Sequence, residues 1–311
     1  MKFSLFMMPC HHPSENPTLA FQRDIELIHL AEKLGFDEAY IGEHHSGGWE
    51  TMPAPELALS MAGATAKRIR LGTSVFSAPF HHPFYLAERM CFLDHLTHGR
   101  AILGVGPCSL VTDKMLFNME ERSLYPMLHE AIDVIVRLLE ADEPISHHGE
   151  FWQFEDMQLQ LRSHQQPRLP LAMPSAATPA NLELIGRHDM IWMSPAGKTR
   201  VQPEENWKHV VNGARKAGRE SNRDNWRIAT YMHIAETREQ AMQEVRAGIL
   251  REAEYFSAIG LRGHYQQHEG QQVADFTAES CAEKRPLPDS SSSSSSSRAR
   301  AMVQRSSGAR R

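Results

Sequence analysis

The chain has 311 residues, of which 41% are hydrophobic, and its formal net charge is −5. This length is enough for one large α/β barrel or for two smaller domains, each with a buried core. The acidic balance excludes the strongly basic character of most nucleic-acid-binding proteins, so no nucleic-acid partner is expected.

The cysteines and the first residues limit where the protein works. Its four cysteines, at positions 10, 91, 108 and 281, form no Cys-x-x-Cys pair, so neither a disulfide framework nor a zinc ribbon is indicated. The apolar start stops at Pro9, which is too early for a signal peptide, and no apolar run approaches the roughly 20 residues of a membrane helix. We therefore expect a cytoplasmic protein without membrane association.

The chain opens with a strand, a helix and a second strand. Residues 3–8 form a compact apolar run, which is typical of a buried parallel strand. Residues 18–34 carry apolar side chains at helical spacing, and Gly35 suits the end of that helix. A short apolar strand follows at residues 39–41.

Three ionisable residues, Glu43, His44 and His45, follow the second strand. A strand that ends in this way brings one carboxylate and two imidazoles to the rim of the fold. Imidazole titrates near neutral pH and a neighbouring carboxylate tunes it, so the triplet is suited to proton transfer. Alone, the triplet is equally compatible with a polar surface turn.

The alternation of strand and helix continues to residue 256. Strands are predicted at 69–76, 101–105, 169–173, 189–193 and 227–235, and helices at 55–68, 85–96, 120–139, 181–186, 203–217 and 238–256. Residues 144–168 are polar, aromatic and proline-containing, and are expected to form an excursion from the repeat. Seven strand–helix units in one direction favour a TIM (β/α)8 barrel over an open doubly wound sheet.

A normal eighth βα unit is lacking from this pattern. The hydrophobic pattern fades from about residue 260, residues 290–297 are all serine, and residues 290–311 hold arginines but no acid. A segment of this composition buries too little apolar surface to offset the conformational entropy lost on folding. We therefore predict a barrel domain at residues 1–260 and an atypical, disordered tail at residues 261–311.

With the strands placed, the rim segments resemble those of the bacterial luciferase-like, flavin-dependent monooxygenases. The matching segments are Met1-Lys2-Phe3, Gly35-Phe36-Asp37, Glu43-His44-His45, Leu71-Gly72-Thr73, His82-Pro83, Leu93-Asp94, and Gly99-Arg100 before Gly104-Val105-Gly106. The resemblance covers residues 1–256 and is closest in character to the limonene-type and alkane-type enzymes. It implies a TIM barrel that uses FMN, as FMNH2 from a separate flavin reductase, and O2 as co-substrate.

The resemblance also implies roles for individual residues. His44 would stand beside the flavin C4a atom as the catalytic residue, where it handles the proton of a C4a-(hydro)peroxyflavin. Glu43 would line the same site. Ser74 and Val75 would pack along the isoalloxazine ring, where a bulged peptide is common, and Gly106 would be the small residue beside the ring.

A phosphate site and a substrate pocket follow from the same resemblance. Arg122 is similar to the family's phosphate arginine, and Ser175, Ala176 and Thr178 match the loop whose hydroxyls and amides hold the phosphate. The candidates for the apolar substrate pocket are Phe6, Met8, Trp49 and Trp192. Aromatic side chains at strand ends equally often form barrel core.

The predicted reaction is the oxygenation of a hydrophobic small molecule of the terpene, aldehyde, ketone or alkane class. Two alternatives stay open: a deazaflavin (F420)-dependent oxidoreductase on the same barrel, and an inactive flavin-binding relative. A homodimer is expected, because family members often pair through the early helices. The His-His pairs at positions 11, 44, 81 and 147 lack metal-site spacing, so no metal is predicted.

Overall fold

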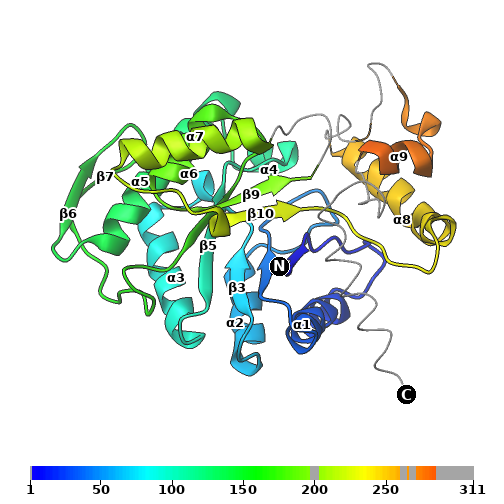
Figure 1. Ribbon diagram of the computed structural model, residues 1–311, viewed down its shortest axis with the longest axis horizontal. Helices are drawn as coiled ribbons and strands as arrows, with labels where there is room; N and C mark the ends of the chain where they lie inside the picture. The colour runs from blue at the N-terminus through cyan, green and yellow to red at the C-terminus, as the bar shows by residue number, and fades with distance from the viewer. Residues whose placement is uncertain (1, 197–202, 260–264, 266–270, 285–311) are drawn as a thin grey trace. The chain divides into compact units, whose positions relative to one another are not determined.

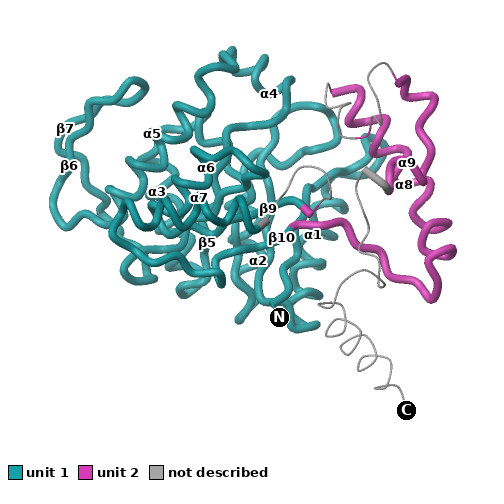
Figure 2. The backbone as a smooth tube through the Cα atoms, turned by 45° about the horizontal axis from the view of Figure 1, so that its top comes forward, with its two compact units in different colours: residues 1–195, 200–228 teal, residues 196–199, 229–311 magenta. Residues whose placement is uncertain are grey.

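The computed structural model describes residues 2–196, 203–259, 265 and 271–284. The chain divides into two compact units, shown in different colours in Figure 2. Unit 1 is residues 1–195 with 200–228, and unit 2 is residues 196–199 with 229–311. This division differs from the predicted boundary at residue 260. Residues 285–311, the serine-rich part of the tail predicted at residues 261–311, lie outside the described residues.

Strands and helices alternate along unit 1 as the sequence predicted (Figure 1). The strands are β1 Ser4–Met7, β2 Glu38–Ile41, β3 Arg70–Thr73, β4 Phe76–Ser77, β5 Ala101–Gly106, β8 Leu171–Pro174, β9 Ile191–Pro195 and β10 Trp226–Ala229. The helices are α1 Pro17–Lys33, α2 Pro55–Thr65, α3 Pro83–Leu96, α4 Val111–Leu116, α5 Glu121–Glu140, α6 Pro179–Arg187 and α7 Pro203–Lys216, with single 3-10 turns η1 Ala78–Phe80 and η2 Arg223–Asn225. Proline begins α1, α2, α3 and α6, where its fixed φ suits a helix start.

The parallel strands form a nearly closed barrel in the order β1-β2-β3-β5-β8-β9-β10. Each strand from β1 to β9 pairs in parallel with its neighbour in this order, which confirms the predicted TIM-barrel class. The described residues contain no eighth barrel strand after β10. None of the described helices is long and apolar enough to cross a membrane.

Side chains alternate between the barrel interior and the surrounding helices. In β2, Ala39 and Ile41 belong to the main hydrophobic core under the helices, whereas Glu38 and Tyr40 point to the other side. There the Tyr40 hydroxyl donates to Glu38, and Arg227 of β10 donates two hydrogen bonds of 2.8 Å to the same carboxylate. A charge-assisted bidentate pair thus joins β2 to the last strand of the barrel.

One predicted strand is split into β3 and β4. Gly72 pairs with Ile102 of β5, and Phe76 pairs with Val105. The chain advances four residues on one side but three on the other, so one extra residue bulges out of the ladder. The peptide bond between Ser74 and Val75, inside this bulge, is cis.

Glycines on the neighbouring strands leave room for the bulge. A Cβ atom on Gly104 would overlap the carbonyl oxygen of Thr73. A Cβ atom on Gly42 would lie 2.8 Å from the carbonyl oxygen of Ser74. The backbone of residues 73–75 therefore approaches both neighbouring strands more closely than a larger residue would allow.

The predicted excursion at residues 144–168 contains an antiparallel hairpin, β6 Ile145–His148 and β7 Gln153–Met157. The carboxylate of Glu130 on α5 accepts hydrogen bonds from the backbone N–H groups of residues 150–152. It also lies 2.9 Å from Nε2 of His147. One acidic side chain therefore fixes the hairpin to the barrel's outer helices.

Unit 2 contains α8 Arg238–Ala258, η4 Val273–Asp275 and α9 Ala278–Lys284. Helix α9 is a correction to the sequence analysis, which predicted disorder from residue 261. The helix forms because Ala278 and Cys281, one turn apart, are fully buried as α9 packs against α8. Because α8 packs against η4 and α9, it groups with the C-terminal residues.

Replacing Gly104 with alanine is expected to destabilise the protein by about 2 kcal/mol, because the added Cβ forces Thr73 out of place. Chemical denaturation measures the change. Gly248→Ala is the matched control, since Gly248 lies in α8 with open space around its Cα, and its replacement should stabilise by up to about 1 kcal/mol. Equal effects of the two substitutions would contradict the close approach at Gly104.

Candidate functional site

His44 lies where β2 passes into the loop before α2, at the carboxyl end of the barrel strands. Its Nδ1 is 3.0 Å from Oδ2 of Asp113, and its Nε2 is 2.8 Å from Oε2 of Glu50. The His44 side chain is 14% exposed, and both carboxylate side chains are buried. Both ring nitrogens are therefore held by carboxylates.

These two carboxylates decide the charge of His44. Burial disfavours the imidazolium, but the hydrogen bonds to Asp113 and Glu50 outweigh burial and raise the pKa of His44 to about 9. For Asp113, burial acts to raise the pKa, but the bonds from His44 and Ser46 hold it below its ordinary value. At neutral pH His44 is therefore a cation, hydrogen-bonded to Asp113 through Nδ1 and paired with Glu50 at Nε2.

Asp113 and Glu50 were missed by the sequence analysis. Asp113 lies on α4, a helix that the sequence analysis did not predict. Its carboxylate also accepts hydrogen bonds from the backbone N–H of His45 and the hydroxyl of Ser46. A six-residue helix is too short to show apolar periodicity, and 69 positions separate Asp113 from His44. The sequence offered one signal for a partner of His44: the acidic residue Glu50 follows it by only six positions.

Glu43 is the centre of a second polar group at the same rim. Its buried carboxylate accepts a hydrogen bond of 2.6 Å from the backbone N–H of Ser77. The same carboxylate lies 2.6 Å from Nε2 of His81 and 3.0 Å from Nε2 of His45. Because a carboxylate only accepts, both imidazoles present Nε2–H to it. Glu43 thus orients two histidines, and its predicted contact with flavin stays a prediction.

The loop after β8 contains an unusual buried hydroxyl. Ser175 is 7% exposed, and its Oγ has no hydrogen-bond partner among the residues that the structure describes. Its backbone is fixed, since its N–H donates to Met193 and its carbonyl accepts from Nε1 of Trp192. Ala176 and Thr178 follow as exposed residues, and Thr178 precedes α6 without a side-chain bond to the helix. A free hydroxyl beside an open helix start suits an anion.

Arg122 lies on the surface near the start of α5. Its side chain is 85% exposed and pairs with Glu120 at 2.6 Å. Further along α5, Nε2 of His129 lies 2.8 Å from Oδ1 of Asn181, in the first turn of α6. Arg122 precedes His129 by two helical turns, about 10 Å along the same face. Arg122 thus lies on the side of α5 that meets α6. Its side chain is paired with Glu120, and its predicted phosphate contact stays a prediction.

Ser74, Val75 and Gly106 lie together where β3 is interrupted. The Ser74 hydroxyl is 3.5 Å from the sulfur of Met193, across the barrel end. A Cβ atom on Gly106 would lie 2.7 Å from Cγ2 of Val75. A larger residue at position 106 would therefore meet Val75, another of the predicted flavin residues. The predicted flavin contacts of these residues stay predictions.

Two of the predicted pocket residues lie at the start of the barrel. Phe6 of β1 faces the barrel interior, since Ser4, two residues earlier, bonds to the interior residue Glu38. Its side chain is 43% exposed, so the space that it faces is not filled by core packing. Met8 follows β1 as a half-buried residue. The predicted contact of both residues with a substrate stays a prediction.

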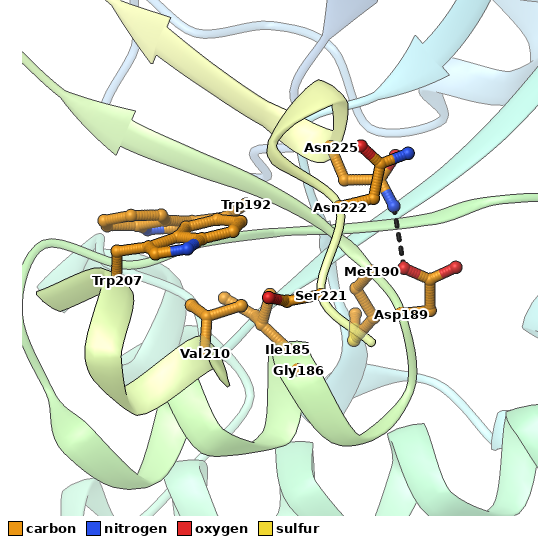
Figure 3. Close-up of a pocket in the computed structure, with 10 residues that line it drawn as sticks. All are labelled: Ile185, Gly186, Asp189, Met190, Trp192, Trp207, Val210, Ser221, Asn222 and Asn225. Atoms are coloured by element: carbon orange, nitrogen blue, oxygen red, sulfur yellow. Dashed lines mark hydrogen bonds between the residues drawn. The ribbon is translucent and has the colours of Figure 1, made fainter. Parts of the chain in front are cut away.

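The two tryptophan candidates are placed differently. Trp49 is half-buried in the loop after β2, edge-on to the ring of His12. Trp192 is fully buried on the helix side of β9, where it stacks with Trp226 and Trp207. The cavity in Figure 3 lies at this stack and has about 10 Å³, room for about one water molecule. Trp192 therefore belongs to packing between β9 and α7, and the structure does not bring it to the rim.

Fold and site together define a class of protein: a parallel-barrel enzyme with acid–base groups at the carboxyl ends of its strands, where such barrels hold their active sites. The cluster includes a cationic histidine between buried carboxylates and a carboxylate that orients two further histidines. Across the described ranges, no three His, Cys, Asp or Glu side chains are grouped so as to hold a metal ion.

Comparisons with known proteins agree with this class. The profile of the family described as "Luciferase-like monooxygenase" matches residues 1–291. The chain is 38% identical over 266 residues to 4-hydroxyprotoasukamycin monooxygenase of Streptomyces nodosus subsp. asukaensis, covering 84% of this chain and 72% of that protein. It is 35% identical over 260 residues to limonene 1,2-monooxygenase of Rhodococcus erythropolis, covering 83% and 66%.

A solved structure shares the fold. The oxygenating constituent of 3,6-diketocamphane monooxygenase from Pseudomonas putida, in complex with FMN, superimposes with a TM-score of 0.75 at 20% identity, covering 92% of this chain and 83% of that one. The chain belongs to the luciferase-like monooxygenase family. The predicted family, fold class and enzyme class are thereby confirmed.

The ion pairs of His44 should make stability depend on pH. Because the pKa of His44 rises from 6.5 to about 9 on folding, its contribution is complete below about pH 6.5 and disappears as pH rises through 9. The shift corresponds to a contribution on the order of 3 kcal/mol. Unfolding free energies of the wild type and His44→Gln, measured from pH 6 to 10, should converge with rising pH. A constant difference would contradict a charged His44.

Proposed function

We propose that the protein is the oxygenase of a two-component flavin-dependent monooxygenase. In this proposal FMNH2 arrives from a separate reductase, and one oxygen atom of O2 enters a hydrophobic small molecule of the terpene, aldehyde, ketone or alkane class. Family membership supports the flavin and the monooxygenase chemistry. The names of the relatives, which include limonene 1,2-monooxygenase, support a hydrophobic substrate.

The observation that carries the proposal is the buried imidazolium of His44 between Asp113 and Glu50. A residue held cationic at the mouth of the barrel stabilises negative charge and holds a proton at Nδ1 and Nε2. Because both protonated nitrogens face carboxylates, His44 acts as a fixed positive charge and not as a base.

The residues of the rim fit a flavin. The unpartnered hydroxyl of Ser175 and the open start of α6 suit its phosphate, and Arg122 lies two turns from the contact of α5 with α6. An arginine so placed adds a charge to the phosphate site once it leaves Glu120. The bulge at residues 73–75, with small residues on both sides, leaves backbone facing the barrel end.

The remaining residues of the rim prepare the site. When bound, reduced flavin supplies the electrons that activate O2. Glu43 fixes the orientation of His45 and His81. Phe80 and Phe117 stack with ring centroids 4.4 Å apart, and His45 lies 4.9 Å from the Phe117 ring. These aromatic rings limit the access of water to the histidines, which favours oxygenation over release of hydrogen peroxide.

His44→Gln should lower the rate of product formation about 100-fold, whereas FMNH2 oxidation continues with release of hydrogen peroxide, because the fixed positive charge is lost. The measurement is product and peroxide formed per O2 consumed, with a supplied reductase and a panel of terpenes, aldehydes and ketones. His188→Gln is the matched control, since His188 also pairs with a carboxylate, Asp133, but on the helices outside the barrel. Unchanged coupling in His44→Gln would remove His44 from the mechanism.

The phosphate site can be tested without turnover. Ser175→Ala should weaken FMN binding about 10-fold but leave riboflavin binding unchanged, because only FMN carries the phosphate that the hydroxyl would meet. Arg122→Ala should act in the same way, with Arg187→Ala, at the far end of α6, as its control. Equal losses for FMN and riboflavin would place these residues outside the phosphate site.

The alternatives from the sequence remain distinguishable. An F420-dependent oxidoreductase would bind the deazaflavin more tightly than FMN and consume no O2, and an inactive relative would bind FMN without oxygenation. The homodimer and the cytoplasmic location stay predictions. Several apolar side chains on α2 and α3 and at the end of α1 are more than half exposed, as a dimer surface would require. They include Leu34, Leu57, Met61 and Phe92.

A further inference from the structure

The loop after β2 contains a short segment, residues 49–52, that we call the strap. On one side, the carbonyl oxygen of Met52 accepts a hydrogen bond of 3.0 Å from the backbone N–H of His44. On the other side, the carbonyl oxygen of Trp49 accepts a hydrogen bond of 2.8 Å from the backbone N–H of His11. The strap therefore connects the functional histidine to the loop between β1 and α1.

Glu50 lies at the centre of the strap. Its backbone forms an antiparallel bridge with Cys10, which fixes the position of its Cα atom. Its side chain is 1% exposed and reaches Nε2 of His44 at 2.8 Å. Because the backbone is held on one side and the imidazole on the other, the carboxylate has one orientation available to it.

A buried contact between a histidine and a carboxyl group holds the strap against α1. His11 is 5% exposed, and its Nε2 lies 2.9 Å from Oδ2 of Asp24 on α1. Its Nδ1 lies 3.3 Å from the hydroxyl of Thr51 in the strap. Burial raises the pKa of the Asp24 carboxyl group, and the contact joins the strap to α1 through His11. The proposed function assigns no role to this pair.

We propose that Glu50 is a positioning residue for His44, and that the strap and the His11–Asp24 pair hold it in place. This inference rests on the proposed function, because it gives His44 the catalytic role. The charged groups facing His44 are Asp113 from α4 and Glu50 from the strap. Asp113 fixes one ring nitrogen, and Glu50 fixes the other, so the ring has neither rotational nor tautomeric freedom.

Glu50→Gln keeps a hydrogen-bond acceptor at Nε2 and removes the charge. In the flavin-free protein, the titration midpoint of His44, followed by NMR of its ring carbons and nitrogens, should fall by about 1–2 pH units. Glu50→Asp should restore part of the shift. Glu130→Gln is the matched control, since Glu130 also pairs with a histidine, His147, but in the β6–β7 hairpin, and it should leave His44 unchanged. A shift in Glu50→Gln no larger than in this control overturns the proposal.

The wild-type protein provides a second test that does not depend on the folding of a variant. With both nitrogens bonded to buried carboxylates, His44 should show two slowly exchanging ring protons near neutral pH. A single such proton would overturn the proposal. Neither NMR readout requires flavin or turnover, so a protein with the predicted His44 titration but no oxygenase activity would disprove the proposed function and leave the role of Glu50 intact.

Discussion

The site depends on a positive charge buried between two negative ones. An imidazolium removed from water is unfavourable alone, and two neighbouring carboxylates are unfavourable together, but the three groups satisfy each other's hydrogen bonds. His44 comes from the end of β2, Asp113 from α4 and Glu50 from the strap. The charge can persist only when these three segments are in place together, so folding of the rim and charging of the histidine are one event.

The barrel makes this arrangement possible by bringing segments that are distant in sequence to one end. At the interior, Arg227 of β10 pairs with Glu38 of β2 across 189 positions, which fixes the spacing of the strands below the rim. Above them, the bulge between β3 and β4 packs closely against Gly42 and Gly104, where larger residues would not fit. The ion pair thus joins the strands inside the barrel, and the bulge shapes the carboxyl end of the barrel.

The sequence predicted the fold well because its signals are local. Apolar runs and helical spacing located the strands and most helices of unit 1, and the motif around Glu43 and His44 located the rim. The partners of His44 were not predictable, because Asp113 lies on a helix too short to show periodicity and its contact is made 69 positions away. Trp192 was misleading because a strand-end aromatic residue can face either side of its strand, and an apolar pattern does not distinguish them.

The stack of Trp192, Trp207 and Trp226 has a consequence for optical work on this protein. Three of its five tryptophans form one parallel stack, with centroids 4.6 to 6.2 Å apart, between β9, β10 and α7. Indole rings this close share excitation energy, so their emission behaves as that of a single chromophore. Of the other two tryptophans, Trp49 lies in the rim loop. A change in fluorescence that Trp49→Phe removes can therefore be assigned to the rim loop.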